Sequence, residues 1–381
     1  MIHNGVNMEY KNFFNEIGIS DEETAKRLEE IKQEYFFGPD KVYFDAGDDM
    51  GYIMDTGNND ARTEGMSYGM MICVQLDMKE QFDRIWKWSK TYMFMSHGFN
   101  EGYFAWSCAT DGTKNANGPA PDGEEYYALA LFFASARWGD GEGIFNYSQE
   151  AQEILSAMIN KGGPDREGAP MFNNENHQIL FTPGSPFTDP SYHLPHFYDI
   201  FATRAYPEDR DFLKKAARAS REYLIKACHP VTGFSPEYAE FDGEGLRHDL
   251  PWTNDRHSRF YSDSYRTVAN ISLEHIWGGE DIGQTAACAK IQRALLDDMR
   301  ANDFKIYEVD GTVYGTEKAL HPVGLLATVA ETVAVTGIDD VSKEWLTTFW
   351  NTPLRKGERR YYDNCLYFFA FLALSGNYRI Y

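Results

Sequence analysis

The chain has 381 residues and a formal net charge of −22 at pH 7, from 36 Lys and Arg against 58 Asp and Glu. Proteins that bind nucleic acid or anionic membranes need clustered positive charge, so we expect neither partner. No apolar run reaches the roughly 18 residues of a transmembrane helix, and the first residues do not resemble a signal peptide. Without a Pro/Ser-rich linker, residues 1–381 are expected to form a single cytoplasmic domain that acts as a monomer.

The cysteines and the aromatic residues narrow the chemistry further. Aromatic residues make up 15% of the chain, which suits sugar-binding surfaces and, more simply, a large aromatic core. The cysteines occur singly, as is typical of reduced, buried thiols rather than of a disulfide framework or a zinc site, so we expect no metal and no cofactor. They are Cys73, Cys108, Cys228, Cys288 and Cys365.

Apolar residues recur with the 3.6-residue period of helices along most of the chain, and strand-like alternation is rare. With helix-capping residues as boundaries, twelve helical segments are predicted, so the protein is expected to be all-α. In chain order they span residues 21–37, 64–78, 79–94, 122–138, 146–161, 191–205, 208–228, 260–278, 282–302, 320–336, 341–351 and 361–375.

These segments are of two kinds. Segment 208–228 has one charged face, as expected of a surface helix, whereas segments 122–138 and 361–375 are apolar or small nearly all round, as expected of enclosed helices. The simplest closed arrangement of such a pattern is an (α/α)6 barrel with six inner and six outer helices. The six enclosed segments begin about 60 residues apart, near residues 64, 122, 191, 260, 320 and 361.

In such a barrel all inner helices begin at the same end, because each outer helix carries the chain back. Three acidic residues lie at or near these starts, and each also has a purely structural explanation. Glu64 would stabilise a helix dipole. Asp122 would form a capping box with Glu125. Asp263 would follow a helix cap at Ser262.

Three carboxylates around one concave, aromatic opening nevertheless favour catalysis, because their repulsion raises the pKa of one of them. Glycoside hydrolysis uses such a pair. A protonated carboxylic acid donates to the leaving oxygen, and an ionised carboxylate activates water or attacks the anomeric carbon. The separation of the two groups decides between these mechanisms.

Seven motifs are spread nearly from end to end of the chain: RTEGMSYGMM, GYFAWSC, GPAPDGEEYYALALFFASARWGDG, DPSYHLPHFY, YSDSYR, LHPVG and RRYYDNCLY. Together they resemble glycoside hydrolase family 8, and within it the enzymes that release xylose from the reducing end of xylo-oligosaccharides. The resemblance implies an (α/α)6 barrel and an inverting, exo-acting hydrolase whose substrates are short β-1,4-xylo-oligosaccharides.

The resemblance also implies roles for the three carboxylates. Glu64, in RTEGMSYG, would be the general acid, and Asp263, in YSDSYR, the general base. Asp122, in APDGEE, would hold the sugar in subsite −1 and favour its distorted ring. We expect burial among aromatic residues, together with Asp122, to keep Glu64 protonated near neutral pH.

Four further residues would support the reaction in this resemblance. Tyr192 would share the nucleophilic water with the general base, Arg266 would brace that base, and Trp106 would offer a stacking surface. His321, in LHPVG, is similar to a histidine whose loop closes the leaving-group side beyond subsite +1, leaving room for one xylose. Its structural alternative is a buried histidine at a helix start, with Pro322 at the first helical position.

Two features depart from the family or have no assigned role. Pro121 and Glu124 stand where the broad family has Ser or Thr and a second Asp. Residues 241–260 are expected to form a long loop near the base, and neither Trp252 nor His257 within it receives a function.

Three other functions remain open from the sequence. The chain could be an endo-acting β-1,4-xylanase or β-glucanase of the same family. It could also be a sugar-binding toroid without catalysis, in which the acids only cap helices. Zinc-dependent chemistry on a similar toroid would need a Cys/His ligand set, which the single cysteines do not supply.

Overall fold

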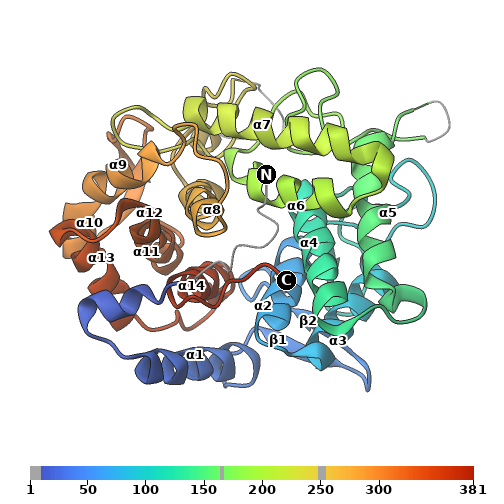
Figure 1. Cartoon of the computed structure of the whole chain (residues 1–381), viewed down its shortest axis with the longest axis horizontal. Coiled ribbons are helices and arrows are strands. Elements are labelled where there is room, and N and C mark those ends of the chain that lie inside the picture. Colours follow the sequence, from blue (N-terminus) through green and yellow to red (C-terminus); the bar gives the residue numbers. More distant parts are fainter. Residues whose placement is uncertain (1–9, 164–166, 248–254) are drawn as a thin grey trace.

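Two concentric rings of helices make up the molecule, seen end-on in Figure 1 of the computed structural model, which describes residues 10–163, 167–247 and 255–381. The predicted (α/α)6 barrel is confirmed. The inner ring consists of α2 (Thr63–Gln75), α4 (Pro121–Trp138), α6 (Pro195–Arg204), α8 (Tyr265–Ile276), α11 (Pro322–Glu331) and α14 (Arg360–Leu374). The outer ring consists of α3 (Lys79–Trp88), α5 (Tyr147–Asn160), α7 (Arg210–Ala227), α9 (Ala286–Ala294), α13 (Asp340–Asn351) and α1 (Asp21–Phe36).

Burial separates the two rings as the sequence predicts. In α4 every residue from Pro121 to Ala134 is buried, and in α14 every residue from Tyr361 to Leu374. The outer helix α7 buries only one side, including Leu213 and Leu224, and exposes most of its charged residues, the exception being Arg221, which is buried in an ion pair with Glu274. Because removing apolar surface from water stabilises by roughly 25 cal/mol per Å², helices that are apolar all round belong where both sides are covered.

Several helix boundaries differ from the expected ones. Segment 282–302 is divided into α9 and α10 (Leu296–Ala301), and segment 320–336 into α11 and α12 (Val333–Thr336). The starts expected at residues 191 and 260 are wrong, because the helices begin only at Pro195 and Tyr265. Short turns precede them, since proline cannot continue a helix and Ser262 has a left-handed backbone with φ 42°. The short helical turns are η1 (Phe13–Ile17), η2 (Ser89–Met93), η3 (Gly143–Phe145), η4 (Pro190–Tyr192), η5 (Pro207–Asp209), η6 (Asp255–Ser258) and η7 (Ser262–Ser264).

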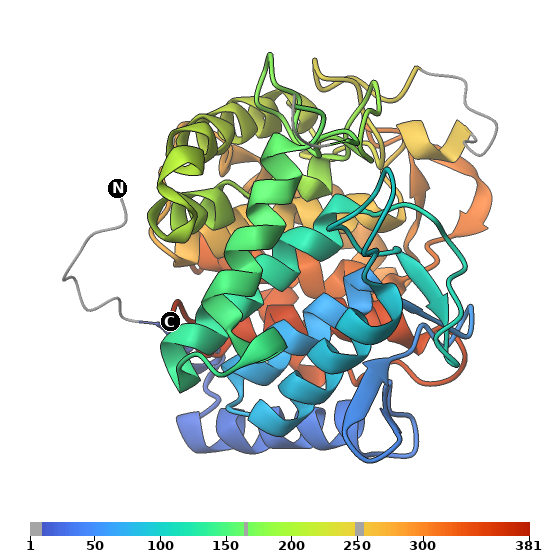
Figure 2. The ribbon, with the colours of Figure 1, turned by 90° about the vertical axis from the view of Figure 1, so that its right-hand side faces the viewer.

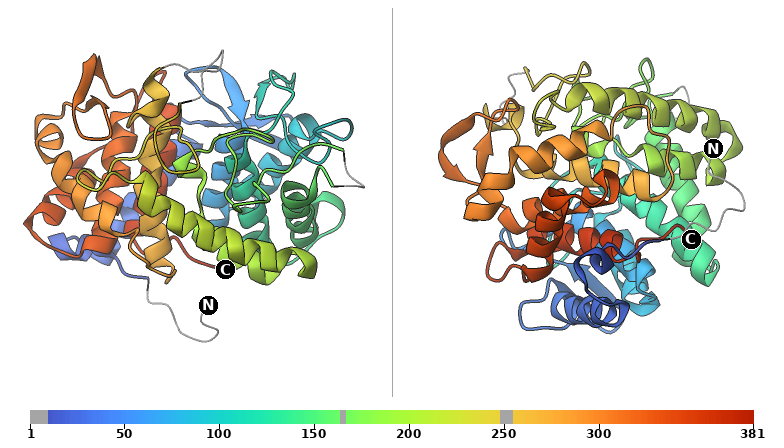
Figure 3. Two further views of the ribbon diagram at one scale, coloured as in Figure 1. Left: turned by 90° about the horizontal axis from the view of Figure 1, so that it is seen from above. Right: turned by 60° about the vertical axis from the view of Figure 1, so that its left-hand side comes forward.

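Three two-stranded antiparallel sheets, two of them hairpins, stand at the barrel end where the inner helices begin, away from the chain termini; this end is called the hairpin end (Figure 2). Seen from above in Figure 3, loops and hairpins crowd this end. Strand β3 leads directly into α2 and pairs with β4, Arg62 lying opposite Ser107, so this pairing fixes the start of α2. The strands are β1 (Tyr43–Ala46), β2 (Met50–Ile53), β3 (Asp60–Arg62), β4 (Ser107–Ala109), β5 (Lys305–Tyr307) and β6 (Val313–Lys318).

The last residues of the chain run across the opposite end of the barrel. The Gln75 side chain, at the end of α2, donates to the Arg379 carbonyl over 3.0 Å and accepts from its N–H over 2.9 Å. Trp277, just after α8, donates from its indole nitrogen to the Tyr378 carbonyl over 2.9 Å. The tail thus ties the far ends of inner helices together and leaves the hairpin end for a site.

Candidate active site

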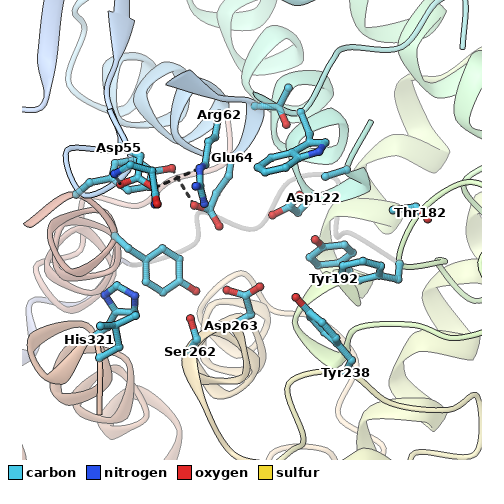
Figure 4. Close-up of a pocket in the computed structure, with 18 of the residues that line it drawn as sticks. Asp55, Arg62, Glu64, Asp122, Thr182, Tyr192, Tyr238, Ser262, Asp263 and His321 are labelled. Atoms are coloured by element: carbon cyan, nitrogen blue, oxygen red, sulfur yellow. Dashed lines mark hydrogen bonds and ion pairs between the residues drawn. The ribbon is translucent and has the colours of Figure 1, made fainter. Parts of the chain in front are cut away.

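A cavity of about 650 Å³ lies at the hairpin end of the inner ring, a volume within the usual range of ligand sites. All seven residues singled out from the sequence are at or next to it. Arg266 contacts the carboxylates, and the other six line the cavity directly: Glu64, Trp106, Asp122, Tyr192, Asp263 and His321, all but Trp106 labelled in Figure 4. The structure therefore brings together residues as far apart in the sequence as Glu64 and His321.

Glu64 is held at the start of α2 from both sides. The N–H of Thr63 donates to the Trp106 carbonyl over 3.0 Å, which places the first turn of the helix. The Tyr361 hydroxyl donates to Glu64 Oε1 over 2.8 Å, and Arg266 Nη1 donates to Oε2 over 3.1 Å. Only 17% of the Glu64 side chain is exposed, so the group is largely withdrawn from water yet reaches the cavity.

Arg266, in the first turn of α8, joins all three carboxylates. Its Nη1 lies 3.1 Å from Glu64 and 3.0 Å from Asp122, and it donates to the Tyr68 hydroxyl over 2.7 Å. Its Nη2 lies 3.5 Å from Asp263 Oδ2, the longest of these contacts. The guanidinium thus contacts Asp263, as a residue that braces it must, and it holds Glu64 and Asp122 more closely than this aspartate of the preceding turn.

Burial makes Glu64 a weak acid. It raises the pKa of this carboxyl to about 8, aided by the negative charges of Asp122 and Asp263 and opposed by Arg266 and by the Tyr361 hydrogen bond. Burial likewise raises the pKa of Asp122, again against the effect of Arg266. A carboxyl group with a pKa near 8 is mostly protonated at neutral pH, which is the state that a general acid requires.

Asp122 is not a capping residue, which corrects the structural alternative given above. The N-cap of α4 is Ala120, which makes no side-chain cap, and Asp122 Oδ1 accepts only from the adjacent N–H of Gly123, over 2.9 Å. Glu125 instead forms a hydrogen bond with the Tyr198 hydroxyl, away from the helix start. Asp122 Oδ2 faces Arg266 and the cavity.

Asp263 owes its place to a strained turn. Ser262 is not its helix cap: its left-handed backbone, a conformation costly for a residue with a side chain, turns Asp263 toward the cavity. The hydroxyl that secures this turn belongs to Ser264, which accepts from the Tyr261 N–H over 2.9 Å. With 24% of its side chain exposed, Asp263 is the most accessible of the three carboxylates, as suits a group that activates water.

A second carboxylate behind Asp263 was not found from the sequence. Glu237 is buried, lies 3.5 Å from the Asp263 backbone nitrogen, and meets His257 Nδ1 at 2.6 Å. His257 in turn stacks on Tyr238, a wall of the cavity, with ring centroids 4.3 Å apart. His257 thus has a place beside the site, whereas Trp252 lies outside the described residues.

Two aromatic residues line the cavity in different ways. Trp106 is 39% exposed, and the Arg62 guanidinium lies 5.3 Å from its ring. Tyr192, on η4, is buried, stacks against Phe181 with centroids 5.9 Å apart, and faces the cavity on the side away from His321 (Figure 4). Sugar rings pack on exposed aromatic faces, and of these two residues Trp106 offers one.

His321 lies at a helix start and also borders the cavity. It is 9% exposed and precedes α11, with Pro322 at the first helical position, so the helix-start alternative is confirmed. It also lines the cavity, with its ring edge-on to Tyr362 at 4.7 Å. The histidine is therefore a fixed wall of the cavity on the side opposite Tyr192.

The departures at Pro121 and Glu124 leave the cavity intact. Pro121 occupies the first position of α4, where its missing N–H costs nothing. Glu124 turns away, since its Oε1 accepts from the Phe104 N–H over 3.0 Å in the core. Burial raises its pKa well above the usual range.

The cysteines and the potential metal ligands indicate whether the fold contains disulfides or a metal site. All five cysteines are free and buried, which confirms the prediction of buried thiols. Across residues 10–163, 167–247 and 255–381, no three His, Cys, Asp or Glu side chains gather as metal ligands. No helix in these ranges is both long and apolar enough to cross a bilayer.

The geometry defines the class of protein. A weakly acidic carboxyl group faces a more accessible carboxylate across one guanidinium, in an aromatic cavity at the mouth of an (α/α)6 barrel. Glycoside hydrolases use two carboxyl groups that differ in this way, one protonated and one ionised, so the cavity has the features of a glycoside hydrolase site.

Comparison with known proteins gives the family. Residues 45–375 match glycosyl hydrolases family 8, and the chain belongs to this family, whose members invert the anomeric centre. It is 52% identical to a reducing end xylose-releasing exo-oligoxylanase of Halalkalibacterium halodurans over 98% of this chain and 94% of that protein. A protein of the same description from Bifidobacterium adolescentis is 47% identical over 97% and 96% of the two chains. The structure of Rex8A from Paenibacillus barcinonensis, complexed with xylose, superposes with a TM-score of 0.94 at 49% identity, covering 98% of this chain and 97% of that one.

Gly65 in α2 packs against Tyr361 in α14, the residue that donates to Glu64, and a substitution at Gly65 tests whether activity depends on this hydrogen bond. A Cβ at Gly65 would lie 2.5 Å from the Tyr361 ring, so Gly65→Ala is expected to displace the tyrosine that donates to Glu64. We expect a loss of about 1–3 kcal/mol in the free energy of unfolding and reduced hydrolysis of xylotriose. Urea unfolding and initial rates measure both. Gly118→Ala is the control, because its Cβ would meet nothing nearer than 3.9 Å; equal stability and rate in the two variants would contradict the argument.

Proposed function

We propose that the chain hydrolyses short β-1,4-xylo-oligosaccharides and releases xylose from their reducing end. The observation that carries this proposal is the wall formed by Leu320 and His321, which bounds the cavity beside Glu64 and Asp263. In this proposal the wall closes the leaving-group side of the cavity, so that one sugar fits between it and the proton donor. The names of the relatives that share about half of its residues support the same activity.

In this proposal Glu64 and Asp263 divide the chemistry. Glu64 donates its proton to the glycosidic oxygen as the bond from that oxygen to the anomeric carbon breaks. A water molecule attacks the anomeric carbon from the opposite face, and Asp263 takes the proton that the water loses. Carboxylates placed on different nitrogens of one guanidinium are compatible with the roughly 6.5–9.5 Å separation of inverting enzymes, which leaves room for the water.

The neighbouring side chains assist these two groups. Asp122 holds the sugar that is cleaved, and its charge stabilises the positive charge that develops on the ring in the transition state. Tyr192 helps to hold the water, and Trp106 stacks on a sugar farther from the cleaved bond. Arg266 keeps the three carboxylates in place and limits their mutual repulsion.

We also propose that the enzyme is a monomer with one catalytic domain and works in the cytoplasm on short oligomers. Five free, buried cysteines suit a reducing compartment. A cavity closed on one side suits oligomers better than long polymers.

Xylotriose labelled with 13C at its reducing-end anomeric carbon tests the proposed activity. We expect the label in free xylose, unlabelled xylobiose as the second product, and the new anomeric centre of xylobiose first in the α form, all measurable by NMR of fresh hydrolysate. Label in xylobiose, or a β product, would contradict the proposal. Rapid internal cleavage of long xylan or β-glucan would instead support the endo-acting alternative.

A further inference from the structure

Asp363 lies directly behind His321 and is wholly buried. It belongs to the first turn of α14, and its Oδ1 accepts from the N–H groups of Val323 over 2.8 Å and of Gly324 over 2.9 Å. Its Oδ2 lies 3.0 Å from His321 Nδ1 and accepts from Arg355 over 2.6 Å. One carboxylate thus caps α11 from a neighbouring helix and binds the histidine that precedes it.

Arg355 extends this contact to the residue before His321. Its Nη1 donates to the Leu320 carbonyl over 2.6 Å as well as to Asp363. The backbone of Arg355 is held by Asn364, which accepts from its N–H over 2.8 Å and donates to its carbonyl over 3.0 Å. Both cavity-lining residues of this wall are therefore anchored to the start of α14.

A carboxylate only accepts hydrogen bonds, so its contact with Nδ1 requires the hydrogen of His321 to be on Nδ1. Nε2 is then the ring nitrogen left for the cavity, and in the neutral ring it is an acceptor. The positive charge of Arg355 balances the negative charge of Asp363, so the carboxylate acts on His321 mainly through the hydrogen bond to Nδ1. We propose that Asp363 is a positioning residue for substrate selection: it fixes the orientation and tautomer of His321 and so presents an acceptor to a hydroxyl of the departing sugar. This inference rests on the proposed function.

The substitution Asp363→Asn separates this role from simple capping. The amide oxygen can still accept from Val323 and Gly324, so the start of α11 keeps its cap. The amide NH2 group then faces two groups that Asp363 Oδ2 accepts from. Arg355 Nη1 loses this acceptor and keeps only the Leu320 carbonyl, whereas His321 can respond by making Nδ1 the acceptor, which moves its hydrogen to Nε2. The same exchange imposes the wrong histidine tautomer in serine proteases. The variant therefore reverses what His321 offers to the cavity without removing any side-chain volume.

The test combines NMR with kinetics. In 15N-histidine spectra of the wild-type protein, the His321 signal, identified by its loss in His321→Asn, is expected to show hydrogen on Nδ1; in Asp363→Asn it is expected on Nε2. We expect kcat/KM for xylotriose to fall roughly tenfold or more, mainly through KM, because one hydrogen bond to the sugar is reversed. Xylotetraose is expected to yield some xylobiose directly, because Arg355, which also holds the Leu320 carbonyl, loses its bond to Asp363 and the wall loosens.

Asp339→Asn is the matched control, because Asp339 caps the exposed start of α13, accepting from Ser342 N–H over 2.8 Å far from the cavity. Its kcat/KM is expected to stay unchanged. Hydrogen on Nε2 in the wild-type protein, or an Asp363→Asn enzyme with unaltered KM and products, would overturn the inference. The wild-type spectrum shows which nitrogen of His321 carries the hydrogen even if the variant does not fold. A wild-type protein that does not cleave xylotriose would refute the proposed function instead, and leave the NMR result standing.

Discussion

Glu64→Gln is expected to lower kcat/KM for xylotriose by roughly 10²–10⁴-fold, the usual contribution of general acid–base catalysis. Glutamine keeps the shape of the side chain: its oxygen can accept from Arg266 while its NH2 group donates to the Tyr361 hydroxyl, but it has no acidic proton to deliver to the leaving oxygen. Initial rates measure the effect. Glu22→Gln, on the exposed first turn of α1, is the control and should retain full activity.

The pH dependence ties this loss to the proton of Glu64. Because the protonated form is active, kcat/KM of the wild-type enzyme should fall as pH rises through about 8, the raised pKa of this carboxyl. Glu64→Gln should lack this alkaline limb. A xylobioside with a nitrophenolate leaving group, which needs little protonation, should lose much less rate in the variant. A sugar-binding toroid without catalysis would show no difference between the variant and the wild type.

Asp263→Asn is expected to lower kcat/KM by a similar factor, roughly 10²–10⁴, but with a different dependence on the leaving group. Asp263 acts on the water and not on the departing oxygen, so natural and activated substrates should both lose rate. Rates on xylotriose and on the nitrophenyl xylobioside measure this contrast.

Asp310→Asn serves as the control for this second variant, since Asp310 caps an exposed turn by accepting from the Thr312 N–H over 2.8 Å. If Asp263→Asn hydrolysed the activated substrate at the wild-type rate, Asp263 would not be the base. Glu237, buried 3.5 Å behind the Asp263 backbone nitrogen, would then be the next candidate.

The surroundings of Glu64, Asp122 and Asp263 explain how one carboxyl group of the cluster can be a proton donor while another is a proton acceptor. Burial is the largest cause of the raised pKa of Glu64, and the charges of Asp122 and Asp263 add to it. Arg266 works in the other direction and lowers the pKa of both Glu64 and Asp122 against the effect of burial. In the proposed mechanism, the acid Glu64 and the base Asp263 share this cation and differ in burial, since Asp263 is the more exposed of the two.

The sequence by itself determined the helical fold, the two rings and the residues that open the inner helices. Those properties can be predicted from each segment alone. The 3.6-residue period of apolar residues indicates a helix, and an apolar character on all sides, as in segment 122–138, indicates a helix enclosed by others. The motifs around Glu64 and Asp263 likewise indicated the family.

Only the tertiary structure decided how the side chains at the mouth are paired. Arg266 meets Glu64 across 202 residues of chain, and His321 meets Asp363 across 42. Such contacts leave no periodic signal, because each partner looks like an ordinary helix-start residue in its own segment. The left-handed Ser262 that turns Asp263 inward was hidden for the same reason: the surrounding packing, and not the local preference of serine, holds that conformation.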